Sequence, residues 1–523
     1  MKNSNPRFIL ILISLFLSFT LIGAHSSLAS DITKAALIPK PVSIIAGAGH
    51  FELKANTSIR IEEGSPEMQK VANYLSGMLN PATGFSIKVL TGGDIPSSNC
   101  ILLTSGVKND KLGLEGYELT ITKDQIKLEA NKPEGVFRGI QTIRQLLPAK
   151  IESKDLQQVS WKVPAGTIVD YPSYSYRGSM LDVARHFFGA DDVKRFIDLM
   201  TAYKMNILHM HLADDQGWRI EIKSWPALTE IGSTTQVGGG KGGFYTQEVY
   251  KDLVQYAADR YITIIPEIDM PGHTNAALAS VAELNPDNQP TKLYSGTNVG
   301  FSTLQTNKEF TYKFLNDVIR ELAAMTPGPW IHVGGDESHV TKKEDYIPFV
   351  EKVQEIVLAN GKLMIGWDET TLSALKPSTV AQYWSKAENA TRGVSKGVKI
   401  IMSPAAKAYL DMKYNPKTKL GLHWAGYIEV DTGYKWDPAQ LVPGITKENV
   451  LGVECPLWSE TVTNISEIEF LVFPRLPGYA EIGWTPASER IWDTYKIRLG
   501  NQAERFKIMK INYYPSQKVP WKN

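Results

Sequence analysis

The sequence has very little cysteine and almost no excess of charge. Its two cysteines among 523 residues, Cys100 and Cys455, lie far apart along the chain. Such a pair provides neither a disulfide framework nor the spacing of a metal site, so two buried, unpaired thiols are expected. The 56 basic and 55 acidic residues leave a formal net charge of +1. Without a long run of one sign, the chain offers no electrostatic footprint for nucleic acid or an anionic membrane, and a neutral partner fits better.

Long apolar runs are also missing, except for one near the N-terminus. The run from Phe8 to Ile22 follows basic residues and precedes small ones. This pattern is typical of an export signal, which we assign to residues 1–30. A retained membrane anchor is the alternative, but the run is shorter than the ~20 residues that a spanning helix needs. We expect an exported protein, periplasmic, extracellular or lysosomal according to the host, with no stable membrane insertion once the signal is removed.

The length exceeds what one hydrophobic core usually organises, and it predicts two domains after the signal. Residues 31–172 show short alternating strands and helical stretches without an obvious cluster of reactive side chains, as in a small accessory α+β domain. A connection rich in Pro, Gly, Ser and Tyr, residues 164–175, leads out of it. The expected strands include 58–62, 117–121 and 125–130, and the expected helices are 67–79 and 135–147.

A repeated order of strand, loop and helix begins after Tyr176. Eight apolar runs, several of them separated by helical patterns, favour a (β/α)8 barrel over residues 173–523, an α/β fold with a parallel sheet. An open, doubly wound sheet is the alternative, but no strand leads into a Gly-x-Gly-x-x-Gly or Walker-type loop, so dinucleotide chemistry is not expected. The expected strands are 180–183, 207–212, 262–268, 331–333, 362–366, 380–383, 398–402 and 451–457, and the clearest helices are 191–203, 247–260, 308–324 and 345–360.

One strand end carries two consecutive acids. The strand that ends at Val333 passes through Gly334-Gly335 into Asp336 and Glu337. Neighbouring side chains on a regular strand point to opposite faces, so both acids can serve one site only if the backbone turns there, which a glycine pair permits. The alternative is a solvated loop or a helix N-terminus, because Asp-Glu dipeptides are common.

Acids, histidines and aromatics also follow other strands, at the barrel end where active-site groups cluster. Buried polar groups and flat rings together fit a neutral ligand with many hydroxyls, such as a sugar. His209 and His211 share one strand face and are either hydrogen-bonded core histidines or metal ligands, Arg177 is alternatively a counter-ion for barrel acids, and each tryptophan is alternatively a packing residue. The strand-end inventory is Arg177, residues 182–185, His209, His211, Asp214, Asp215, Glu267, Asp269, His273, Asp336, Glu337, Trp367, Asp368, Glu369, Trp384, Tyr409, Asp411, Trp424, Trp458 and Glu460.

Four segments form a recognisable set: Arg177-Gly178-x-x-Leu181-Asp182-x-Ala184-Arg185, His209-x-His211-Leu212-x-Asp214-Asp215-Gln216-Gly217-Trp218-Arg219, Pro266-Glu267-Ile268-Asp269-x-Pro271-Gly272-His273, and His332-x-Gly334-Gly335-Asp336-Glu337. In this order and spacing the chain resembles glycoside hydrolase family 20, the exo-acting β-N-acetylhexosaminidases. The resemblance covers most of the mature chain and implies that the region before about residue 172 is the accessory α+β domain of that family.

The resemblance implies chemistry in which the substrate's own 2-acetamido oxygen attacks the anomeric carbon, so an opposed second carboxylate is not needed. Glu337 would be the general acid and then the base for water, while Asp336 would hold the acetamido N–H and stabilise an oxazolinium intermediate, with retention of configuration. His273 and Asp214 match the pair near the acid in the family, and Asp269 is a partner behind them. We expect burial and the Asp336 charge to raise the pKa of Glu337, while Asp336 stays ionised.

For recognition, the resemblance implies a closed pocket for one terminal, non-reducing GlcNAc or GalNAc residue of a glycan or chito-oligosaccharide. No cofactor and no metal are expected, and a homodimer is left open. Two hypotheses compete: a metal-dependent barrel hydrolase that uses His209 and His211, and a carbohydrate-binding protein that has lost catalysis. The residues expected to bind the sugar are Arg177, Trp367, Trp384, Tyr409, Asp411, Trp424, Trp458 and Glu460.

Overall fold

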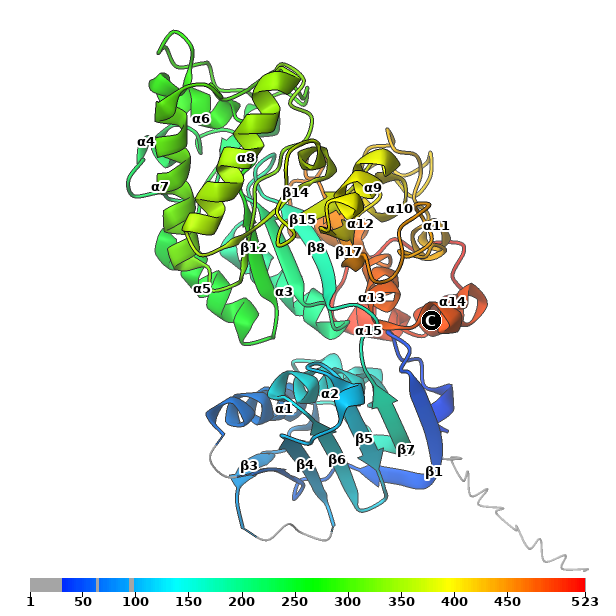
Figure 1. Cartoon of the computed structure of the whole chain (residues 1–523). Helices are drawn as coiled ribbons and strands as arrows, with labels where there is room; N and C mark the ends of the chain where they lie inside the picture. Colours follow the sequence, from blue (N-terminus) through cyan, green and yellow to red (C-terminus); the bar gives the residue numbers. More distant parts are fainter. Residues whose placement is uncertain (1–30, 63–64, 94–97, 523) are drawn as a thin grey trace, which may run out of the picture.

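The computed structural model describes residues 31–62, 65–93 and 98–522. The expected export signal, residues 1–30, lies outside the described residues. Figure 1 shows a smaller body built from the N-terminal part of the chain and a larger body that continues to the C-terminus. Among the helices of the described residues, none is both long and apolar enough to cross a bilayer.

The smaller domain is a mixed sheet with two long helices on the side that faces the larger domain (Figure 1). The predicted strands β5 and β6 pair antiparallel, with Tyr117 opposite Ala130 and Ile121 opposite Ile126. Alternate residues of both strands are buried, which is the pattern of a sheet with one covered face. In sheet order the strands are β1 (Ser43–Glu52), β7 (Lys162–Asp170), β5 (Tyr117–Ile121), β6 (Gln125–Ala130), β4 (Cys100–Ser105), β2 (Ser58–Ile61) and β3 (Lys88–Thr91).

The two helices of this domain, α1 (Pro66–Thr83) and α2 (Pro133–Leu146), each begin at a proline. Proline suits the first helical position because no N–H is needed there. Ser65 caps α1 by accepting a hydrogen bond from Met68 N at 3.2 Å. The apolar faces of both helices pack into one core with the buried side of the sheet.

Eight parallel strands close the larger domain into a barrel, so the predicted (β/α)8 fold is confirmed and the open sheet is excluded. The last strand, β17, pairs with the first, β8, and each of the eight predicted strands overlaps one of these elements. In chain order the strands are β8 (Tyr176–Asp182), β9 (Ile207–His211), β12 (Thr263–Glu267), β13 (Trp330–His332), β14 (Leu363–Trp367), β15 (Val380–Tyr383), β16 (Lys399–Met402) and β17 (Val450–Leu457).

The four clearest predicted helices are present and lie outside the barrel (Figure 1): α3 (Ala190–Ala202), α5 (Gln247–Ala258), α7 (Glu309–Met325) and α8 (Lys343–Ala359). The helices nearer the C-terminus were not predicted, because several are short and α13 is buried on every side and so lacks an amphipathic pattern. The remaining α-helices and strands are α4 (Ala227–Glu230), α6 (Asn275–Ser280), α9 (Ala387–Ser395), α10 (Ala405–Ala408), α11 (Val430–Tyr434), α12 (Ile465–Val472), α13 (Leu476–Trp484), α14 (Trp492–Gly500), α15 (Ala503–Ile508), β10 (Ala213–Asp214) and β11 (Gly217–Trp218).

Buried charges join the smaller domain to the amino-terminal end of the barrel. The Glu115 side chain, in a residue only 7% exposed, accepts hydrogen bonds from Arg138 Nε at 2.9 Å and Arg177 Nη1 at 3.0 Å. Nearby, Lys204 Nζ forms an ion pair with Asp170 at 2.9 Å. Because the other domain covers this end of the barrel, a ligand site is expected at the carboxyl-terminal end.

Candidate active site

A pocket of about 220 Å³ opens at the carboxyl ends of the barrel strands. Its walls are acids and aromatic rings from loops that follow different strands. The predicted site residues that meet here are Asp336, Glu337, Trp384, Tyr409, Asp411, Trp424, Trp458 and Glu460. The lining also includes Arg185, Thr297, Val299 and Leu422.

A strained turn points both catalytic candidates into this pocket. After β13 the backbone takes positive φ at Gly334 (65°) and Gly335 (100°), and again at Glu337 (45°). A Cβ on Gly334 would lie 1.8 Å from Asp269 Oδ1, so a larger residue does not fit there. The predicted break in the strand is therefore present, and Asp336 and Glu337 both line the pocket. Left-handed backbone at a residue such as Glu337 is costly and clusters at functional sites.

His273 and Asp214 lie behind the two acids, in the places that the resemblance predicted. His273 Nε2 is 3.6 Å from Glu337 Oε2 and 3.8 Å from Asp336 Oδ2. On the other side of the ring, His273 Nδ1 is 3.2 Å from Asp214 Oδ1, and Arg185 Nη2 is 2.7 Å from Asp214 Oδ2. Burial lowers the pKa of His273, but the Asp214 carboxylate and the two pocket acids hold it well above its ordinary value.

The pKa values of the two pocket acids are shifted in opposite directions, and that of Glu337 is shifted against the expectation from sequence. Burial raises the pKa of Glu337, but contact with the cationic His273 and the charge of Arg185 outweigh burial, and the pKa lies below its ordinary value. Burial raises the pKa of Asp336, and the Glu337 charge adds to the rise, although His273 opposes it. The expected elevation for Glu337 is therefore wrong, because that expectation omitted the cation beside the carboxyl.

Stacked and edge-on rings form much of the pocket wall. Trp384 and Tyr409 are stacked, with centroids 6.5 Å apart and planes 17° apart, and Trp424 meets both rings edge-on. Trp458 contacts Tyr409 and, at 5.8 Å, Trp367. Trp367 is only 1% exposed and packs behind Trp458, whereas Trp424 is 57% exposed. Flat rings of this kind can cover the apolar faces of a sugar.

Several carboxylate oxygens in the pocket are buried without a hydrogen-bond partner among the described residues. They are both Oδ atoms of Asp411, Oε2 of Glu460 and Oδ1 of Asp336. Burial raises the pKa of Asp411, and the Glu460 charge adds to the rise. A buried unpaired acceptor costs about 1–3 kcal/mol, so the pocket is suited to a ligand that brings several hydrogen-bond donors.

Arg177 does not reach the pocket, and the prediction that it binds sugar hydroxyls is wrong. It is the second residue of β8, at the amino-terminal end of the barrel, and it is fully buried against Glu115 of the other domain. Arg185 belongs to the same motif but follows the carboxyl end of β8. It lines the pocket, with its guanidinium 4.6 Å from the centroid of the Trp458 ring. Strand direction decides between the two arginines, because the pocket lies at the carboxyl ends.

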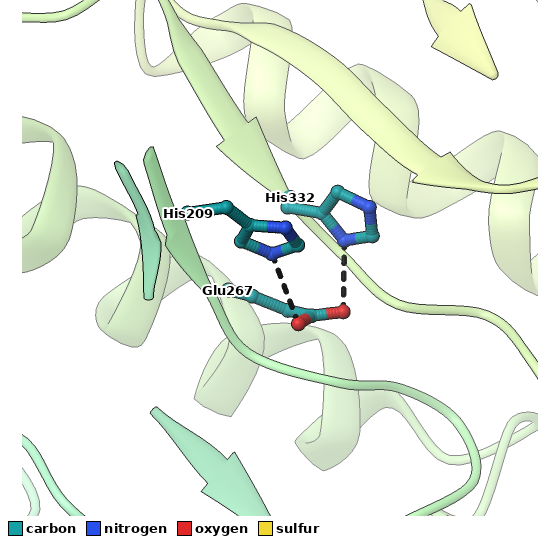
Figure 2. A group of neighbouring side chains, drawn as sticks. All are labelled: His209, Glu267 and His332. Atoms are coloured by element: carbon teal, nitrogen blue, oxygen red, sulfur yellow. Dashed lines mark ion pairs between the residues drawn. The ribbon is translucent and has the colours of Figure 1, made fainter. Parts of the chain in front are cut away.

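His209 and His211 are core histidines in contact with buried carboxylates. His211 Nδ1 is 2.5 Å from Glu267 Oε2, and its Nε2 is 2.9 Å from Asp214 Oδ2. Figure 2 shows the Glu267 carboxylate facing the neighbouring rings of His209 and His332, whose nitrogens lie 3.0 and 2.9 Å from the carboxylate oxygens. Two ligand atoms of a tetrahedral zinc ion lie about 3.3 Å apart, so these shorter spacings fit direct contacts between the side chains better than an intervening metal.

Two family models match the chain, one over each domain. The model of glycosyl hydrolase family 20, domain 2, matches residues 34–171, and that of the glycosyl hydrolase family 20 catalytic domain matches residues 174–487. The chain belongs to glycoside hydrolase family 20. This family 20 chain is 38% identical to a β-N-acetylhexosaminidase of Cellulomonas fimi over 490 residues, which cover 93% of this chain and 97% of the relative.

Solved structures of family 20 enzymes have the same architecture. The β-N-acetylhexosaminidase of Streptomyces coelicolor matches with a TM-score of 0.90 and 46% identity, over 93% of this chain and 99% of that one. The exo β-N-acetylglucosaminidase of Vibrio harveyi, solved with N-acetylglucosamine, matches with a TM-score of 0.80 and 29% identity, over 93% and 79% of the two chains. The family 20 chain is therefore a glycoside hydrolase of the β-N-acetylhexosaminidase type, as the sequence predicted.

The family 20 pocket also contains residues that the sequence did not single out. Thr297 and Val299 line it from the segment between α6 and α7, and Leu422 lines it from the segment after α10. An isolated valine, threonine or leucine carries no chemical signal for a ligand. Arg185 did carry one, because it stands just beyond a predicted strand in the first motif.

Proposed function

We propose that this family 20 enzyme removes terminal, non-reducing N-acetyl-β-hexosamine residues, GlcNAc or GalNAc, from a glycan or chito-oligosaccharide. Glu337 protonates the glycosidic oxygen and then activates water. Asp336 accepts a hydrogen bond from the acetamido N–H. It also stabilises the oxazolinium that forms when the acetamido oxygen attacks the anomeric carbon. Two displacements at that carbon retain its configuration. The observation that carries the proposal is the pair of acids turned into one pocket, with Asp336 Oδ1 buried and free to accept an N–H.

The other side chains of the pocket suit a single sugar ring. Asp411 and Glu460 offer unpaired carboxylate oxygens to ring hydroxyls, and Arg185 takes the role predicted for Arg177. The tryptophans cover the apolar faces of the ring, and the Tyr409 hydroxyl donates to the acetamido oxygen. A volume of about 220 Å³ supports exo action on one terminal residue.

Before the sugar binds, His273 holds the proton that Glu337 later donates. The pKa directions favour an ionised Glu337 beside a protonated His273. A sugar in the pocket displaces water from the Glu337 side chain, which is 29% exposed. Loss of that water raises the pKa of the carboxyl and favours transfer of the proton to Glu337 at the moment when the leaving group needs it.

The test is a comparison of terminal β-linked sugars with and without the 2-acetamido group, with the anomer of the first product followed by NMR. We expect cleavage of N-acetylhexosaminides with retention and negligible cleavage of the matching glucoside. A glucoside hydrolysed at the same rate, or an inverted product, would overturn the proposal.

We also propose that residues 1–30 direct export, on the basis of the apolar run and the basic residues before it. N-terminal sequencing of the protein recovered from the periplasm or the medium tests this assignment. A mature protein that still begins at Met1 would contradict it.

A further inference from the structure

One buried carboxylate, Glu267, connects two parts of the site without lining the pocket. It is the last residue of β12 and is fully buried. Its Oε1 accepts a hydrogen bond from Trp367 Nε1 at 3.0 Å, and its Oε2 accepts one from His211 Nδ1 at 2.5 Å. His209 and His332 lie against the same two oxygens (Figure 2). Four nitrogen atoms therefore surround this carboxylate, and the two hydrogen bonds, from Trp367 and His211, fix its orientation.

The first connection leads to the aromatic wall. The Trp367 indole has a single N–H donor, and Glu267 accepts it, so the ring can make this bond in only one orientation. The ring centroids of Trp367 and Trp458 are 5.8 Å apart, and Trp458 lines the pocket. A change in the orientation of Trp367 would therefore shift the wall against which the sugar packs.

The second connection leads to the general acid. His211 contacts carboxylates through both ring nitrogens, with Nε2 2.9 Å from Asp214 Oδ2. Burial lowers the pKa of His211, but Glu267 and Asp214 hold it well above its ordinary value, so both nitrogens carry protons. Asp214 in turn contacts His273 at 3.2 Å, and His273 lies 3.6 Å from Glu337. Each side chain in this series of contacts, from Glu267 to Glu337, fixes the orientation of the next.

We propose that Glu267 is a positioning residue for the reaction, which orients Trp367 in the sugar-binding wall and, through His211 and Asp214, orients His273 against Glu337. The inference rests on the proposed function, because it concerns the same site. A displacement of about 1 Å at such a site costs about 100-fold in rate, which sets the size of the expected effect.

The substitution Glu267→Gln keeps the shape of the side chain and removes its charge, and Glu454→Gln is a matched control. Glu454 is also buried, but its hydrogen bonds go to His209, Gln382 and Tyr176. We expect kcat/KM on N,N'-diacetylchitobiose to fall about 100-fold in E267Q and far less in E454Q, with the fold of both checked by circular dichroism. Equal losses of kcat/KM in E267Q and E454Q would show that removal of either buried charge has the same general effect, and would overturn the proposal. A wild-type chain without activity would instead refute the proposed function.

Two further variants test the two connections separately, so a failure of E267Q to fold leaves the proposal testable. Trp367→Phe keeps an aromatic ring but removes the indole N–H together with the five-membered ring, and we expect KM to rise with little change in kcat. His211→Gln interrupts the path to the acid, and we expect kcat to fall with little change in KM. Wild-type constants in both variants, or the opposite division between kcat and KM, would overturn the proposal.

Discussion

Replacement of His273 by asparagine should move the alkaline limb of the pH–rate profile to lower pH. In the wild type, His273 and Glu337 share the proton that the leaving group receives, and the imidazole retains it as the pH rises because its pKa is raised. In the variant, Glu337 alone must hold that proton. Since the ordinary pKa of a glutamic acid is about 4.3 and that of histidine about 6.5, the proton is then lost at lower pH.

The attraction between the two side chains adds to the difference of about 2 units between those ordinary pKa values, and its size follows from the distance between them. At 3.6 Å from His273 Nε2 to Glu337 Oε2, the attraction of the charged forms is about 1 to 5 kcal/mol for effective dielectric constants of about 80 to 20. At about 1.4 kcal/mol per pH unit, this attraction corresponds to about 1 to 3 units. Water around the Glu337 side chain, which is 29% exposed, favours the lower half of that range.

The assay is kcat/KM on N,N'-diacetylchitobiose from acidic to mildly alkaline pH, because the sugar leaving group of this substrate requires the proton. The control is His339→Asn, which removes an exposed histidine whose charge acts less strongly on Glu337. We expect the limb of H273N to move to lower pH while that of H339N stays near wild type. An unmoved limb in H273N, a shift to higher pH, or equal shifts in both variants would refute the reasoning.

Three other substitutions separate catalysis from stability. Glu337→Gln should lower kcat on the disaccharide about 10²–10⁴-fold and lower it much less on a nitrophenyl glycoside, whose leaving group needs no acid; equal losses would argue against Glu337 as the acid. Asp336→Asn should lower kcat/KM about 10²–10³-fold and weaken inhibition by a thiazoline analogue of the intermediate, whereas unchanged inhibition would remove Asp336 from that role. Glu115→Gln should destabilise the fold by about 3–5 kcal/mol, measured by thermal unfolding, because two buried guanidinium groups lose their shared carboxylate. Its KM should stay at the wild-type value, and a raised KM would contradict the placement of Arg177 outside the pocket.

Features that depend on nearby residues in the chain were predictable from the sequence. The length and the pattern of the apolar runs that form the barrel strands can be recognised from neighbouring residues, and all eight strands were predicted. The turn at Gly334-Gly335 was predictable because only glycine tolerates such a backbone beside another chain segment. α13, by contrast, is buried on every side, so its sequence has no polar face to reveal its period.

Features that depend on distant residues were not predictable in the same way. The pKa of Glu337 is set by His273 and Arg185, which come from loops after other strands, and its direction was predicted wrongly. Arg177 and Arg185 stand in one motif, but seven strand residues, Tyr176–Asp182, separate the two ends of the barrel that they occupy. A motif read as a linear string shows which residues are present, whereas the direction of the strand shows which of them meet the ligand.

The conformations of His273 and Glu337 show how the barrel places its acid. Both residues have left-handed backbone, with φ of 55° and 45°, which costs about 1–2 kcal/mol for a residue with a side chain. The surroundings compensate for this cost, since Gly335 N donates to Asp269 Oδ1 at 3.0 Å and the Tyr346 hydroxyl donates to Gly335 O at 2.6 Å. The first of these contacts joins the segment that carries His273 to the turn that carries Glu337, and the two side chains lie 3.6 Å apart. The proton affinity of Glu337 is therefore a property of several loops together, and contacts remote from the sugar can alter it.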